Sequence, residues 1–304
     1  MKGCIVAGIL IPLIMLRTSV AQQVIPVTWP TRHASKPVSL QKPAADFLPV
    51  FRIGLKFAPE SNIVALALSQ PAFLGLQPAE AARLQTLCAD RYRLIEQDAA
   101  FRTAPSSLPY CFSAQTPSNG LAVIYRPKHT DASTPCLVYL HGYGGSFLWD
   151  QHLLAEAFPD RIIISPAYGI SSATVPLPYV TECLAATARQ LGHPLTKPTL
   201  VGLSAGGFGA LRLYAKAPQT FSRAIIIAAY PPQDILAQLS PAMSVCFIAG
   251  ARESYVRSGE FQRALSAIRP RIGKLESKIL PDADHYFLLT QRQKTIDILQ
   301  NWLR

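Results

Sequence analysis

The second part of the chain, from Gly120 onward, alternates apolar strand-like runs with helical runs. One of these runs, Cys136–Leu140, is apolar at every position, as in a strand that is buried on both faces. Strands that alternate with helices favour a mostly parallel sheet, because each helix crosses over a face of the sheet and returns the chain to the same end. We therefore expect an α/β fold with helices on both faces.

The expected strands cover 121–125, 136–140, 161–165, 199–203, 224–228, 244–249 and 275–280, and the expected helices cover 149–158, 179–191, 205–217, 259–268 and 287–303. The preceding segment, 22–118, lacks this rhythm. We expect it to be an N-terminal extension that consists of a proline-rich extended arm, one long helix from Pro78 to about Arg102, and a loop. The α/β domain then covers 119–304.

The N-terminus has the pattern of a secretory signal. Lys2 precedes an uncharged apolar run from Gly3 to Leu16, and Ser19-Val20-Ala21 has the small residues of a cleavage site. The run is shorter than the about 20 residues that span a bilayer. We expect a signal peptide over 1–21, a secreted or periplasmic protein, and no stable membrane span.

Export would expose the cysteines to an oxidising compartment. Five of the six cysteines remain after Cys4 leaves with the signal, so at least one has no partner within the chain. Cys88 and Cys111 are one possible pair, and the pairing stays open. No cysteine pair has the spacing of a metal site.

The formal net charge is +11, but the basic residues are dispersed along the sequence. Arg83, Arg91 and Arg93 share the predicted long helix, where we expect a solvated positive surface. A nucleic-acid partner would require a basic stripe or a known binding module, and the sequence has neither.

The sequence Gly202-Leu203-Ser204-Ala205-Gly206 lies where a predicted strand ends and a predicted helix begins. This is the G-x-S-x-G pattern of a nucleophile elbow, which holds the serine in a sharp turn. The positive end of the following helix faces the same point. Ser204 is therefore the candidate nucleophile.

A serine hydroxyl needs a base to become a good nucleophile at neutral pH. His285 follows the last predicted strand, so it lies at the carboxyl edge of the sheet together with the elbow. It is the candidate base.

A carboxylate that orients this histidine completes such a site. Glu253 follows the strand that ends at Ala249, and the order serine, acid, histidine is the one that the elbow pattern requires. We favour Glu253, while Asp234 and Asp282 remain alternatives.

A glycine-rich turn follows the strand that ends at Leu140 and reads His141-Gly142-Tyr143-Gly144-Gly145. The backbone N–H groups of Tyr143 and Ala205 are the candidate oxyanion-hole donors, and His141 is expected to brace the turn. No nucleotide-binding pattern occurs, and we expect neither a cofactor nor a metal.

These motifs, with Gly250-Ala251-Arg252-Glu253 and Asp284-His285, make the chain from about Leu121 to Arg304 resemble bacterial α/β-hydrolases of the esterase, feruloyl-esterase and depolymerase-like group. The resemblance implies the α/β-hydrolase fold and a serine hydrolase that cleaves carboxylic esters of small molecules or polymers through an acyl-enzyme. The sequence departs from the usual pattern at Glu253, where Asp is more common.

Two rival functions stay open. The same residues could serve a serine peptidase or an acyltransferase, and an exported binding protein could keep the fold without catalysis. There is little room for a large lid within the α/β domain. A cover over the site would come from the N-terminal extension or from the loop at 168–178.

Overall fold

The computed structural model describes residues 21–42 and 44–304. Apart from Ala21, the expected signal segment at 1–21 lies outside the described residues. Eight strands form one sheet: β1 (Gln23–Pro30), β2 (Asn119–Arg126), β3 (Cys136–Leu140), β4 (Ile162–Ala167), β5 (Thr199–Leu203), β6 (Arg223–Ile227), β7 (Ser244–Gly250) and β8 (Lys274–Leu280).

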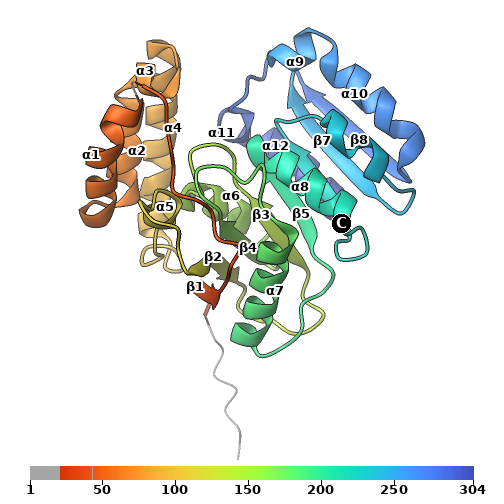
Figure 1. The fold of residues 1–304 in the computed structure, drawn as a ribbon, viewed down its shortest axis with the longest axis horizontal. Helices are drawn as coiled ribbons and strands as arrows, with labels where there is room; N and C mark the ends of the chain where they lie inside the picture. The colour runs from red at the N-terminus through yellow and green to blue at the C-terminus, as the bar shows by residue number, and fades with distance from the viewer. Residues whose placement is uncertain (1–20, 43) are drawn as a thin grey trace, which may run out of the picture.

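The strand order in the sheet is β1-β2-β4-β3-β5-β6-β7-β8 (Figure 1). The pairs β1/β2 and β2/β4 are antiparallel, and every pair from β4 through β3 to β8 is parallel. The segments that follow β3, β5, β7 and β8 therefore leave the sheet at the same edge. This edge carries the four motifs that the sequence indicated.

The helices are α1 (Ala44–Phe57), α2 (Glu60–Leu68), α3 (Pro71–Leu74), α4 (Pro78–Gln97), α5 (Leu108–Cys111), α6 (Leu148–Ala157), α7 (Leu177–Leu191), α8 (Ala205–Lys216), α9 (Ser254–Arg257), α10 (Glu260–Ile268), α11 (Phe287–Thr290) and α12 (Arg292–Leu303). Alternate residues of each buried strand point to opposite faces, so β3 packs Val138 and Leu140 against α7 and α8. Leu137 and Tyr139 point to the opposite face of the sheet, where they pack in a second buried hydrophobic cluster with residues of α4, α6 and α12.

The segment expected to be a proline-rich arm and one helix is more structured than this. Residues 23–30 form β1, which pairs with β2 over its whole length, from Gln23 opposite Arg126 to Pro30 opposite Asn119. Proline is tolerated here because β1 lies at the edge of the sheet, where one row of N–H groups needs no partner. Three helices, α1 to α3, precede the expected long helix, and α5 interrupts the expected loop.

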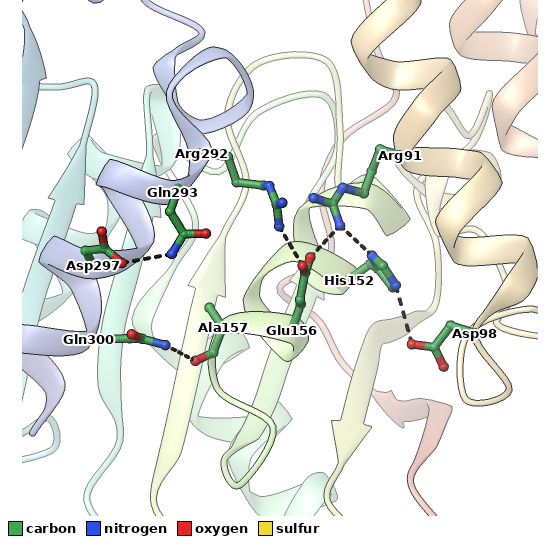
Figure 2. A network of polar contacts seen from close by, with 9 residues as sticks. All are labelled: Arg91, Asp98, His152, Glu156, Ala157, Arg292, Gln293, Asp297 and Gln300. Atoms are coloured by element: carbon green, nitrogen blue, oxygen red, sulfur yellow. Dashed lines mark hydrogen bonds and ion pairs between the residues drawn. The ribbon is translucent and has the colours of Figure 1, made fainter.

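The long helix α4 is bound to the α/β body by a buried polar network, which Figure 2 shows. Arg91 of α4 is buried and donates to Glu156 of α6 at 2.7 Å and to His152 Nδ1 at 3.0 Å. Glu156 also accepts from Arg292 of α12, at 2.6 Å. The expectation of a solvated Arg91 was thus wrong, because the helix turns this residue inward to two partners on α6.

The five cysteines of the described residues are all buried and unpaired, and the possible Cys88–Cys111 bridge is not formed. Burial raises the pKa of the Cys111 thiol to about 12, so it stays neutral. Over residues 21–42 and 44–304, none of the helices has the length and apolar character to cross a membrane.

Candidate active site

Ser204 lies in the sharp turn between β5 and α8. Its backbone has φ 51° and ψ −117°, a conformation that side chains rarely adopt. Gly206 makes the turn possible, because a Cβ at this position would lie 2.0 Å from the Leu140 carbonyl oxygen. The Ser204 N–H donates to the Ile227 carbonyl at 2.7 Å and so holds the turn to β6.

Ser204, His285 and Glu253 form a chain of hydrogen bonds, although they come from three different loops. His285 Nε2 lies 2.9 Å from Ser204 Oγ, and His285 Nδ1 lies 2.7 Å from Glu253 Oε2. The Glu253 side chain is 3% exposed and the His285 side chain 41%, so the acid is buried and the histidine is accessible. Because a carboxylate only accepts, Nδ1 carries the proton that it donates, and Nε2 of the neutral ring accepts from the serine.

The Glu253 loop is fixed against the His285 loop. The second carboxylate oxygen, Oε1, accepts from the Gly250 N–H at 2.9 Å, and the Arg252 N–H donates to the Ala283 carbonyl at 2.8 Å. A Cβ at Gly250 would lie 2.4 Å from this same carbonyl oxygen. This role of Gly250 was not predicted from the sequence, where only its position at the end of a strand could have indicated it.

The alternative acids lie in other contacts. Asp234 pairs with Arg212, whose Nε donates to it at 2.9 Å. Asp282 lies in a turn with a positive φ of 54°, and the neighbouring Asp284 pairs with Arg83 of α4. Glu253 is the acid that contacts His285.

The glycine-rich turn after β3 lies over the elbow. A Cβ at Gly142 would come within 3.4 Å of Ser204 Cβ. His141 is fully buried; its Nε2 accepts from the Tyr168 N–H at 3.2 Å, and its Nδ1 lies 2.8 Å from the Gly142 carbonyl. Burial lowers the pKa of His141 to about 4, so the ring is neutral and braces the turn.

The two expected oxyanion donors come from the start of α8 and from the glycine-rich turn. Ala205 is the first residue of α8, so its N–H has no acceptor within the helix. Tyr143 precedes Gly144, whose N–H donates to the Ile170 carbonyl at 2.8 Å and anchors the turn. Both Tyr143 and Ser204 line an apolar cavity beside the site.

An apolar cavity of about 350 Å³, here named the chamber, opens onto Ser204 and His285. Its far wall comes from α1, α2 and α4 and includes Phe51, Val64, Ala67, Leu68, Leu84 and Cys88. The near wall comes from the glycine-rich turn and from α6. The N-terminal extension was expected as a possible cover, but α1, α2 and their lining residues were not predicted from the sequence.

One acidic residue lines the chamber in the part of the chain that the structure describes. This is Asp150 of α6, which is 2% exposed. Burial raises the pKa of Asp150 well above its usual range, which favours the uncharged carboxyl. Among the described residues, no group of three or more His, Cys, Asp or Glu side chains could hold a metal ion.

No family model and no curated protein matches the sequence. Solved structures do resemble it. An acylaminoacyl peptidase from Pyrococcus horikoshii matches with a TM-score of 0.50 and 10% identity, over 60% of this chain and 39% of that chain. An esterase from Pyrobaculum calidifontis matches with a TM-score of 0.47 and 17% identity, over 60% and 79% of the two chains.

The naproxen esterase from Bacillus subtilis matches with a TM-score of 0.44 and 12% identity, over 61% of this chain and 88% of that chain. At these identities the likeness concerns the fold. The same fold is indicated by the parallel sheet, by the serine elbow between β5 and α8, and by the chain order of serine, acid and histidine. The chain has the α/β-hydrolase fold.

Proposed function

We propose that the protein is a serine hydrolase that cleaves carboxylic esters through an acyl-enzyme. The observation that carries the proposal is the continuous contact from Ser204 Oγ through His285 to the buried Glu253, at 2.9 and 2.7 Å. A base within hydrogen-bond reach of the nucleophile, itself oriented by a third group, is the arrangement that activates a serine.

In this mechanism Ser204 Oγ attacks the ester carbonyl carbon while its proton moves to His285 Nε2. The N–H groups of Ala205 and Tyr143 bind the negative oxygen of the tetrahedral intermediate. When the intermediate collapses, His285 returns the proton to the departing alcohol and the acyl group stays on Ser204. A water molecule then attacks the acyl carbonyl carbon while its proton moves to His285. When this second intermediate collapses, the proton returns to Ser204 Oγ and the carboxylic acid leaves.

Glu253 keeps His285 in the correct tautomer and stabilises its charged form. The carboxylate suits this role because it is buried and its other oxygen is already bound to the Gly250 N–H, which fixes its direction. Glutamate is one methylene longer than aspartate, so its loop needs this anchor to place the carboxylate.

We also propose that the protein acts outside the cytoplasm and that the 119–304 segment is its catalytic domain. The charged start, the apolar run and the small-residue site at Ser19-Val20-Ala21 support export. Detection of a mature N-terminus at Gln22 in secreted or periplasmic material would test this.

A fluorophosphonate probe and an ester substrate test the proposed function. We expect the probe to label the purified protein at Ser204, and we expect Ser204→Ala to lose both the labelling and the hydrolysis of p-nitrophenyl butyrate, by at least about 1000-fold in kcat. Ser277→Ala, on the outer strand β8, is the control and should keep both.

Hydrolysis that is unchanged in Ser204→Ala would contradict the proposal, and a protein that neither binds the probe nor cleaves esters would favour a non-catalytic binding role. Parallel assays with an amide of the same acyl group, and with an added alcohol as acyl acceptor, distinguish an esterase from a peptidase or an acyltransferase.

A further inference from the structure

We infer that the chamber binds an extended aliphatic chain, so that the substrates are esters with a medium or long hydrocarbon chain. The inference rests on the proposed function, because the chamber opens onto Ser204 and His285. It assigns the N-terminal helices a role in choosing the substrate.

The walls of the chamber can offer a substrate little besides hydrocarbon contact. Val64 and Leu68 of α2, Leu84 of α4 and Leu289 of α11 face it from different sides. Buried apolar surface of this kind gains about 0.8 kcal/mol per methylene of the ligand, which equals about fourfold in affinity.

The polar groups on the wall do not favour a charged ligand. Burial is the chief cause of the raised pKa of Asp150 and of the raised pKa of Cys88, about 12, so it disfavours the charged form of both groups. An ionic group that entered the chamber would lose its hydration without gaining an opposite charge. The wall therefore selects against charged substituents on the chain.

The size of the chamber limits the chain. A volume of about 350 Å³ holds on the order of ten groups of the size of water, at about 30 Å³ each. A smaller groove of about 150 Å³ on α1 and α2 shares Phe51 and Ala67 with the chamber. A longer chain could continue into this groove, so the preference should level off rather than end abruptly.

The helical wall is held in place by buried contacts. Glu60, the first residue of α2, accepts from the Tyr92 hydroxyl of α4 and from the Leu148 N–H of α6, both at 2.7 Å. These bonds fix α2 against α4 and α6. The Arg91 network, which Figure 2 shows, also holds α4 against α6. The chamber is thus preformed, which lowers the cost of binding.

A chain-length series of p-nitrophenyl esters tests the inference. We expect kcat/KM to rise by at least tenfold from acetate to octanoate and to level off at longer chains. Ala67→Phe adds bulk to the chamber without removing a packed side chain, and it should cancel most of this rise. Ala89→Phe, on the exposed side of α4, is the matched control and should keep the full rise.

A binding measurement separates this inference from the proposed function. Trp149 lines the chamber, so its fluorescence in Ser204→Ala should change saturably with methyl decanoate or with decyl acetate, but not with methyl acetate. Ala67→Phe in the same background should abolish this change. A response to methyl decanoate means that the chamber binds the acyl part of the ester, and a response to decyl acetate means that it binds the alcohol part.

Failure of all ester hydrolysis with binding intact would contradict the proposed function alone. Hydrolysis with no preference for chain length, or a preference that Ala67→Phe leaves unchanged, would overturn the chamber assignment. A stable Ala67→Phe protein, verified by its urea unfolding midpoint, is needed for this comparison; should it not fold, Ala67→Leu serves in its place and should reduce the rise in part.

Discussion

At the level of single residues, the site depends on a strained backbone conformation and on a buried histidine. Ser204 has a positive φ of 51°, which the close approach of Gly206 to Leu140 permits. His141 is fully buried and neutral; its Nδ1 contacts the Gly142 carbonyl of the glycine-rich turn, and its Nε2 accepts from the Tyr168 N–H after β4. The same contacts that place Ser204 and the glycine-rich turn therefore also affect the stability of the folded protein.

The burial of His141 predicts a loss of stability in mild acid. Its folded pKa is about 4, against about 6.5 for an unfolded histidine. Above pH 6.5 both states are neutral and the full stability is present. Between pH 6.5 and 4 only the unfolded state takes up the proton, so the free energy of unfolding falls by about 3 kcal/mol in total. Below pH 4 this group causes no further loss.

Urea unfolding at pH 7 and at pH 4.5 measures this effect. His141→Asn removes the titrating ring, so its stability should fall between these two pH values by about 2 kcal/mol less than that of the wild type. His129→Asn, at an exposed position, should follow the wild type. Parallel losses in all three proteins would show that His141 is not the source.

Ser204, His285 and Glu253 could be located from the sequence because each follows a strand of the parallel part of the sheet. The strand pattern alone brings such positions to one edge. The burial of Arg91 could not be foreseen, since its partners His152 and Glu156 lie on a helix 61 and 65 positions further along the chain. Periodicity within one helix carries no information about such distant contacts.

At the scale of the element, α4 is the helix that joins the N-terminal wall to the α/β body. Arg91 lies at the centre of this joint, with two acceptors on α6. On the same helix, Arg93 forms an exposed pair with Asp90, three residues before it. The two arginines are close in sequence and differ in environment, so they form a natural comparison.

We expect Arg91→Leu to lower the free energy of unfolding by about 2 kcal/mol, because it leaves the buried His152 Nδ1 without its donor and removes one of the two arginines that bind Glu156. This loss of stability is smaller than that for breaking a fully buried ion pair, because the Glu156 side chain is 43% exposed and keeps its bond to Arg292. Arg93→Leu should cost less than about 0.5 kcal/mol. Urea unfolding of the two variants checks this, and equal costs would contradict a central role for Arg91.

The elements from Gly120 onward were predicted closely. The expected strands at 136–140 and 199–203 coincide with β3 and β5, and the others differ by a residue or two at their ends. β3 and β5 are short buried runs that are bounded by turns, which makes their ends easy to locate. The expected helix at 287–303 is instead divided into α11 and α12 at Gln291, where φ is −126°, and nothing in the sequence breaks the apolar periodicity there.

The elements before Gly120 were mostly missed, for reasons that are physical. β1 contains Pro26 and Pro30, which usually argue against a strand but are allowed at a sheet edge. α1 contains Pro49 in its interior. These segments fold because of what they pack against, and such tertiary contacts override local preference.

At the scale of the whole molecule, the N-terminal helices and the sheet share one hydrophobic core. Leu84, Tyr92 and Ile95 of α4 belong to the same buried cluster as Val123 of β2 and Leu137 of β3. β1 adds backbone pairing to this connection, because it completes the edge of the sheet beside β2. The wall of the chamber is thus built into the core of the protein and is not appended to it.

A shared core predicts that the two parts unfold together. We expect urea unfolding curves from far-ultraviolet circular dichroism and from tryptophan fluorescence to coincide, since Trp29 lies in β1 and Trp302 in α12. A fragment that begins at Asn119 would expose β2 as an open edge and uncover the apolar face beneath α4, and both changes promote aggregation. We therefore expect this fragment to be insoluble or to lack a cooperative transition. A soluble fragment that unfolds cooperatively would instead mean that residues 119–304 fold alone, and the helical wall could then move relative to Ser204.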